Sequence, residues 1–141
     1  MKPDEGVRRR WRRPLLGVMA AFGLTAVLVG YFSWQSYVNG LRGLAIGPLD
    51  LTMVADGEYE GEYDGGLVKA KVRVTVAGHR ITDLTILKHD TGLGRKAESI
   101  VDQIVRAQSL AVDTVAGATC SSKVILKATE AALRYGTFLD Q

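Results

Sequence analysis

The sequence has few cysteine and histidine residues, and this shortage excludes several classes of protein. Its 141 residues contain one cysteine and two histidines. A single cysteine cannot form an internal disulfide, and no Cys/His set has the spacing of a zinc site. No segment matches G-x-x-x-x-G-K-[ST] or G-x-G-x-x-G, so P-loop and Rossmann nucleotide sites are also excluded. No motif links either histidine to a nucleophile, and the sequence predicts no catalytic residue and no metal site.

Charge is absent from the twenty residues between Leu15 and Trp34. A helix of this length spans a hydrocarbon core of about 30 Å, which predicts a transmembrane anchor over residues 15–37. Five arginines lie in the preceding arm, residues 1–14, and they place that arm in the cytoplasm. A cleaved signal peptide is the alternative, although no small-x-small cleavage site is evident. Either interpretation exports the C-terminal part of the chain.

The positive charge is concentrated at the N-terminus. Residues 1–13 carry a net charge of +4, whereas residues 56–141 hold 11 basic and 12 acidic side chains, a net charge of −1. Nucleic acid is therefore not an expected partner of the exported part. Residues 38–55 contain glycines and lack a sustained period, so we expect a linker there. A folded domain follows over residues 56–141.

Three segments near the start of this domain have the two-residue alternation of strands. The first is "GEYEGEYDG", with glutamates on one side and tyrosines on the other. In the second, Val68 to Val76, apolar residues alternate with basic ones, so the two strands can pair acidic against basic faces. The third, "RITDLTILK", is the expected hairpin partner, and its change of phase between Ile81 and Leu84 predicts a bulge.

Two amphipathic helices are expected after the strands. One covers Arg95 to Gln108, and the other runs from Ser121 or Ser122 to Tyr135 and ends at Gly136. On the second helix the expected apolar face includes Ala131 and Tyr135. The run "SLAVDTV", residues 109–115, reads as a short extended strand between the helices. This order predicts an α+β fold, a small antiparallel sheet packed by two amphipathic helices and preceded by one transmembrane helix.

The run from Asp113 to Thr119, "DTVAGAT", leads into the second of these helices. Gly117 and Ala118 leave the Thr119 hydroxyl sterically open, and Thr119 is expected one or two residues before the helix. The N–H groups of a helix's first turn favour an anion attached there. Thr119, Ser121 and Ser122 are also good helix-capping residues, so a purely structural interpretation stays open.

This segment resembles the flavinylation motif of the FMN-binding domain family, in which an Asp, two residues, a small or hydroxyl residue, Gly, Ala and Thr follow one another. Ala116 stands where the family more often has Ser or Thr. The resemblance extends over residues 56–135, including "ITDLTILKH", "GLGRKAESIVDQIVRAQSLAVD" and "SSKVILKATEAAL". The family includes subunits of membrane-bound sodium-translocating and Rnf-type redox complexes, and many small exported proteins.

The resemblance implies a covalent cofactor. In the family, a flavin transferase that uses FAD as donor joins the phosphate of FMN to the last threonine of the motif, here Thr119. The resemblance also implies that FMN contacts the motif residues Asp113, Gly117 and Ala118 and the serines at the start of the helix, Ser121 and Ser122. Near the flavin ring the family has a His-x-Glu-Thr-Pro-Gly turn. A shortened form of this turn, in which Asp90 replaces Glu and proline is absent, implies contacts from His89, Thr91, Gly92 and Gly94. His89 reads equally well as an ordinary strand-end residue, and Cys120 as a space-filler or a reactive thiol.

The leading functional hypothesis is an electron carrier, a membrane-anchored extracytoplasmic flavoprotein with covalent FMN. Its expected partners are the flavin transferase, the membrane, and redox donor and acceptor proteins or a quinone. Because 86 residues offer no visible second substrate site, a complete enzyme is not expected. Two alternatives stay open: a binding module of the same fold for a non-flavin ligand or partner, and an oxidoreductase with its own acceptor.

Overall fold

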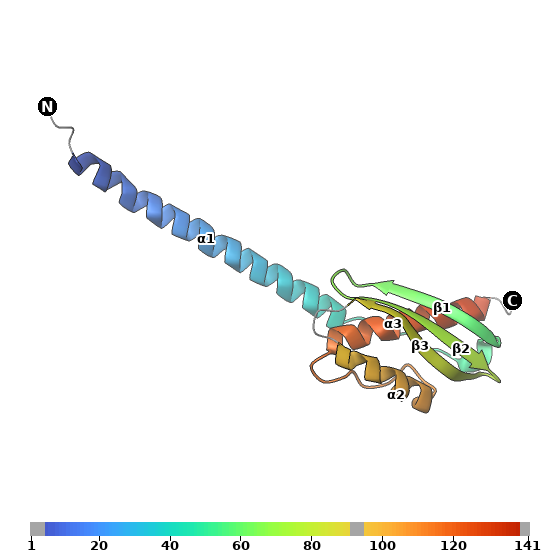
Figure 1. The fold of residues 1–141 in the computed structure, drawn as a ribbon. Coiled ribbons are helices and arrows are strands. Elements are labelled where there is room, and N and C mark those ends of the chain that lie inside the picture. The colour runs from blue at the N-terminus through green and yellow to red at the C-terminus, as the bar shows by residue number, and fades with distance from the viewer. Residues whose placement is uncertain (1–4, 91–94, 139–141) are drawn as a thin grey trace. The chain divides into compact units, whose positions relative to one another are not determined.

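A computed structural model describes residues 5–90 and 95–138 of the chain (Figure 1). The chain divides into two compact units, residues 1–39 and 40–141. The first consists of most of helix α1, Glu5–Arg42. Its stretch Gly17–Arg42 is long and apolar enough to cross a membrane, and its large apolar side chains, such as Phe22 at 75%, are exposed. This helix is a candidate membrane span or signal sequence.

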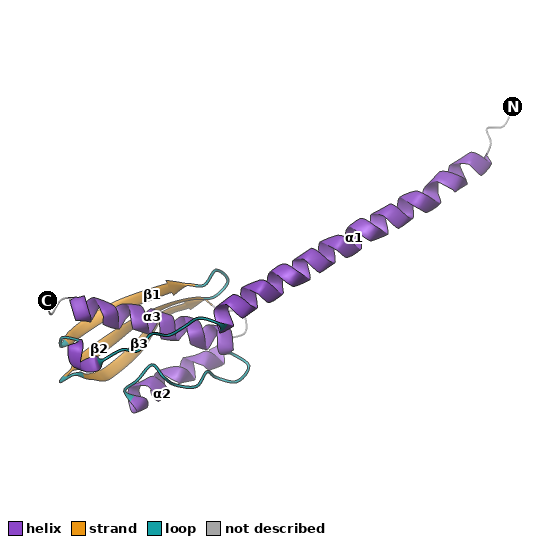
Figure 2. Ribbon diagram, turned by 180° about the vertical axis from the view of Figure 1, so that it is seen from behind, coloured by secondary structure: helices purple, strands orange, loops and turns teal. Residues whose placement is uncertain are grey.

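The second unit is an antiparallel sheet with helices on one face, which confirms the predicted α+β fold (Figure 2). The strands are β1 (Gly57–Asp64), β2 (Lys69–Ala77) and β3 (Arg80–Asp90), in the order β1-β2-β3. A 3₁₀ turn, η2 (Arg95–Ser99), leads into α2 (Ile100–Ala107), which packs on β3. Helix α3 (Thr119–Phe138) packs across β1 and β2.

The hairpin between β2 and β3 contains the predicted bulge. Thr75 pairs with Asp83 and Val76 pairs with Ile81, so Thr82 is the extra residue. A second register shift follows between Lys71 and Val72. The turn itself has positive φ at Gly78 (59°) and His79 (58°), as a two-residue type I′ turn requires.

The outer face of the sheet carries the predicted acidic and basic pairs. Glu60 forms ion pairs of 2.7 Å with both Lys71 and Arg73, and Asp64 lies 2.6 Å from Lys69. Hydrogen bonds from the two cations lower the pKa of Glu60 below its usual value. The opposite face of β2 is buried at Ala70, Val72, Val74 and Val76.

Helix α3 approaches the sheet closely because glycine occupies the crossing point on β1. A Cβ on Gly61 would collide with the backbone oxygen of Ala128 and the backbone nitrogen of Ala132. Near the end of the helix, a Cβ on Gly136 would lie 2.7 Å from the ring of Tyr59. The prediction that Gly136 ends the helix is therefore wrong: it is a buried helical residue that makes room for a tyrosine.

The predicted apolar face of this helix is correct at its centre and wrong at its end. Val124, Ile125, Ala128 and Ala132 are buried, whereas Tyr135 is 64% exposed. Gly136 takes the position that faces β1, and this turns Tyr135 outward.

The predicted strand over residues 109–115 is also wrong, because this segment joins no sheet. Gln108 explains why. Its backbone has φ +50°, and its side-chain amide accepts a hydrogen bond from the Ile81 N–H and donates one to the Ile81 carbonyl, both at 2.8 Å. The amide thus occupies the outer edge of β3, where a fourth strand would pair.

Residues 40–55, which make up most of the expected linker over residues 38–55, pack on the domain. Leu41 and Val54 are buried, and a short 3₁₀ turn, η1 (Leu51–Met53), precedes β1. The Gly47 N–H donates to Glu130 at 3.3 Å, and the Lys123 ammonium donates to the Leu44 carbonyl at 3.1 Å. These contacts make residues 40–55 part of the second unit.

Candidate functional site

The segment from Asp113 to Thr119 forms a loop that ends in a tight turn. The Ala118 N–H donates to the Val115 carbonyl at 3.0 Å, and Gly117, the third residue of the turn, has φ +78°. Positive φ at this position alone is the mark of a type II turn, which favours glycine. A Cβ on Gly117 would meet nothing within 4 Å, so the backbone conformation and not crowding accounts for this glycine.

Thr119 is the first residue of α3 and is half-buried. The Ala118 carbonyl accepts the Ser122 N–H at 2.9 Å, so Ala118 stands at the cap position. The helix thus begins earlier than predicted, and Thr119 does not precede it. Thr119 therefore follows the open turn directly and belongs to the first turn of the helix, the end at which the helix dipole favours a negative group.

Ser121 and Ser122 lie inside the first turn and are buried, so the prediction that they cap the helix is wrong. The Ser122 hydroxyl instead accepts the Val115 N–H at 3.1 Å. This bond ties the motif loop to the helix and fixes the turn that precedes Thr119. Cys120, the second helical residue, is half-buried and forms no disulfide. Asp113, at the start of the loop, is exposed.

His89 lies near the end of β3, opposite Ala70 of β2. Its side chain is only 2% exposed, and its Nδ1 lies 3.4 Å from Oε1 of Glu98. Its Nε2 is buried and has no hydrogen-bond partner within the part of the chain that the structure describes. A buried polar atom without a partner is costly, so this atom suggests a ligand contact. Thr91, Gly92 and Gly94 lie outside the described residues.

The fold brings the end of β3 and the start of α3 to the same end of the domain (Figure 1). The antiparallel register places His89 beside the beginning of β2 and hence beside the end of β1. There a Cβ on Gly65 would lie 3.1 Å from Val124, in the first half of α3. His89 and Thr119, which are thirty residues apart, therefore belong to one end of the sheet.

Two side-chain contacts in this region were not predicted. Glu98 lies within the segment Arg95 to Gln108, which was expected to be a helix, and its Oε1 lies 3.4 Å from Nδ1 of His89. Gln108 appeared to be the last residue of that helix, yet its side chain joins α2 to β3 and also donates to the Val105 carbonyl at 2.6 Å. A polar residue at the end of an amphipathic helix can indicate a side chain that bonds to the backbone of a neighbouring edge strand. Its partner, here Ile81, depends on the tertiary fold and cannot be identified from the local sequence.

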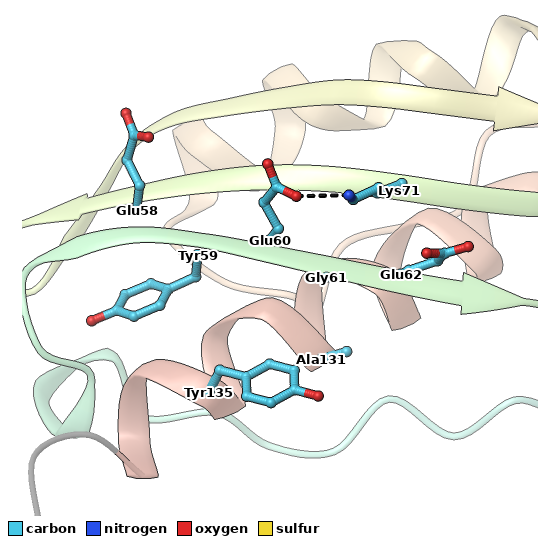
Figure 3. A pocket seen from close by; sticks show the side chains of 8 residues that line it. All are labelled: Glu58, Tyr59, Glu60, Gly61, Glu62, Lys71, Ala131 and Tyr135. Atoms are coloured by element: carbon cyan, nitrogen blue, oxygen red, sulfur yellow. Dashed lines mark ion pairs between the residues drawn. The ribbon is translucent and has the colours of Figure 1, made fainter.

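A hollow lies along β1 and the second half of α3 (Figure 3). Its volume is about 480 Å³, and its lining residues are Glu58, Tyr59, Glu60, Gly61, Glu62, Lys71, Ala131 and Tyr135. Ala131 and Tyr135 follow Thr119 by roughly 18 and 24 Å along a helix that rises 1.5 Å per residue. Three glutamates against one lysine make the hollow unfavourable for a phosphate group.

Glu130, in the second half of α3, organises the contact with residues 40–55. It is 3% exposed and forms ion pairs with Lys127 at 2.7 Å and Arg134 at 2.9 Å. Burial acts to raise its pKa, but the Lys127 hydrogen bond and charge, the Arg134 charge and the Gly47 N–H together hold the pKa below its usual value. Glu130 is thus a buried carboxylate that stabilises the folded domain only while it is ionised.

Comparison with known proteins found a relative and a matching family. An uncharacterized protein of Treponema pallidum (strain Nichols) is 37% identical over 82 residues, which cover 56% of this chain and 23% of the relative. The chain thus spans less than a quarter of that protein's length. Residues 65–134 match the FMN-binding domain, and this segment contains His89, the motif loop and Thr119. Residues 65–134 therefore belong to the FMN-binding domain family.

Proposed function

We propose that this protein is a membrane-anchored electron carrier that holds FMN through a phosphoester on Thr119. The observation that carries the proposal is the position of Thr119: within an FMN-binding domain, it is the first residue of α3 and follows an open type II turn. FMN supplies the redox chemistry when bound, and the protein supplies position and electrostatics.

The residues at this end of the domain fit the two chemically different ends of FMN. The phosphate is an anion, and the N–H groups of a helix's first turn and the dipole of a twenty-residue helix favour an anion at Thr119. The flavin ring carries hydrogen-bonding nitrogen and oxygen atoms. The buried Nε2 of His89 lacks a partner among the described residues and is suited to one of these atoms.

Glu98 sets the role of His89 in this arrangement. A carboxylate oxygen 3.4 Å from Nδ1 can accept a hydrogen bond from an N–H at that nitrogen, and in this tautomer Nε2 is a hydrogen-bond acceptor. A ring N–H group is the matching donor. Glu98 is itself half exposed, so it orients the imidazole and does not need to enter the flavin site.

Attachment requires a flavin transferase with FAD as its donor. The Thr119 oxygen forms a bond to the phosphorus of the FMN half, the diphosphate bond of FAD breaks, and AMP leaves. The hydroxyl proton passes to a base of the transferase. The open space around Gly117 and the half-buried position of Thr119 support access by such an enzyme.

The N-terminal part of the chain supports a location at the cell membrane. Five arginines precede the apolar stretch of α1, which favours a cytoplasmic N-terminus and an extracytoplasmic flavin domain. Outside the cell a dissociated cofactor would be lost by dilution, so a covalent bond has a clear advantage. Electrons would pass between a membrane donor or quinone and an exported acceptor.

The test is coexpression of the full chain with a flavin transferase, followed by mass spectrometry of the peptide from Asp113 to Lys123. We expect one FMN adduct on this peptide and yellow, fluorescent protein after denaturation. Thr119→Ala should abolish both signals, whereas Ser109→Ala, which removes an exposed hydroxyl outside the motif, should retain both. A bare Thr119 beside an active transferase would refute the proposal and leave the binding-module alternative.

A further inference from the structure

Lys123 lies one helical turn after Thr119 on α3. Side chains four residues apart share a face of a helix and lie close enough to interact. Both residues are half-buried, and they begin a partly exposed stripe that continues at Lys127 and Ala131. Lys123 is thus the first cationic side chain along this stripe after the proposed attachment point.

The ammonium group of Lys123 has a polar contact but no acidic partner. It donates to the Leu44 carbonyl at 3.1 Å, and no carboxylate of the described residues forms an ion pair with it. Lys127, one turn further along, is paired with Glu130 at 2.7 Å. An ammonium has three donors, so Lys123 can bind a second acceptor without releasing Leu44.

We propose that Lys123 is the counter-ion of the phosphodiester on Thr119 and bridges it to the Leu44 carbonyl. This inference rests on the proposed function and assigns a further residue to the same site. The phosphodiester has one negative charge, and a charge-assisted hydrogen bond from a partly desolvated ammonium is stronger than one between neutral groups. The helix dipole and Lys123 would then act on the same anion from the same helix.

The bridge has a structural consequence for the segment between α1 and η1, residues 43–50. Two side chains of α3 hold this segment: Lys123 at Leu44 and Glu130 at Gly47. A phosphate that fixes the Lys123 ammonium also fixes its contact with Leu44. Attachment of FMN should therefore order residues 43–50, although these residues need not touch the cofactor.

The experiment compares hydrogen exchange of residues 43–50 in the loaded and the bare full chain, both in detergent. In the wild type we expect loading to slow exchange by about tenfold, the factor that corresponds to about 1.4 kcal/mol. Lys123→Arg should keep the effect, and Lys123→Met, which retains an apolar stem, should lose it. Lys127→Met removes the same charge one turn further from Thr119 and should keep the loading effect.

The outcomes separate this inference from the proposed function. If Lys123→Met loads and shows the wild-type slowing, or if the loaded wild type shows none, Lys123 is not the bridge. A folded Lys123→Met chain that stays bare while Lys127→Met loads supports the inference, because the phosphate then needs this lysine while its bond forms. If the wild type itself stays bare, the proposed function fails first.

Discussion

Substitution of Ser122 by alanine tests whether the motif loop must be fixed for Thr119 to be loaded. Ser122 is 0% exposed, and its hydroxyl accepts the Val115 N–H at 3.1 Å. Ser122→Ala leaves this N–H without its partner, which costs about 1–3 kcal/mol for a buried group. Because Val115 is half-buried, water can replace part of the lost bond, and we expect the lower end, about 1–1.5 kcal/mol.

Ser109→Ala is the matched control. The Ser109 hydroxyl accepts the Ala111 N–H at 3.0 Å, which is the same type of bond in the same connecting segment, but this bond is exposed. Water replaces it, so the expected change stays within about 0.5 kcal/mol. The two variants remove the same hydroxyl and differ in burial and in distance from Thr119.

The assay has two readouts. Hydrogen exchange of the α3 amides in the full chain gives the free energy of opening, and mass spectrometry gives the rate at which purified transferase and FAD load Thr119. Ser122→Ala should lower both the opening free energy and the loading rate, the latter several-fold, and Ser109→Ala should change neither. Wild-type values for Ser122→Ala in both readouts would refute the idea that this bond presents Thr119.

Four other changes should have measurable effects on the full chain. Gln108→Ala should cost about 1–3 kcal/mol and speed amide exchange at Ile81, since both backbone bonds of Ile81 to the side chain are lost; unchanged exchange would contradict this role of Gln108. His79→Gly should stabilise the domain by about 0.5–1 kcal/mol by relieving a positive φ of 58°, as hydrogen exchange can measure. Gly61→Ala should cost more than about 3 kcal/mol, because its Cβ has no space against α3, and the yield of folded protein should fall. The pKa of Glu130 is lowered from 4.5 in the folded protein, so its carboxylate stabilises the fold above pH 4.5, and this stabilisation is lost as the pH falls through the pKa of the folded state. Glu130→Gln should therefore flatten this part of the curve of unfolding free energy against pH.

Local patterns predicted the sheet well because strands with one buried face alternate at every residue. The glutamates of β1 and the basic residues of β2 even indicated their own pairing, and the phase change after Ile81 indicated the bulge at Thr82. Each of these signals lies within two adjacent strands. The strands could therefore be predicted without knowing where the helices pack.

The errors concern residues whose role depends on a distant partner. Gly136 has the signature of a helix end, but the ring of Tyr59 requires a glycine inside the helix. Ser122 has the signature of a cap, but its hydroxyl is used by the Val115 N–H. Residues 109–115 have strand-like composition, but the Gln108 amide occupies the edge they would need.

The same distinction explains what could be predicted of the candidate site. Thr119 follows from a contiguous motif, and its local setting, an open turn and a helix start, is encoded nearby. The pairing of His89 with Glu98 crosses from β3 to η2 and becomes visible only when the sheet is folded. The proposed site thus combines a threonine within a contiguous motif and a histidine whose contact with Glu98 depends on the tertiary fold. Substitution of Glu98 should consequently alter the flavin environment, its spectrum and its potential, and leave the attachment to Thr119 intact.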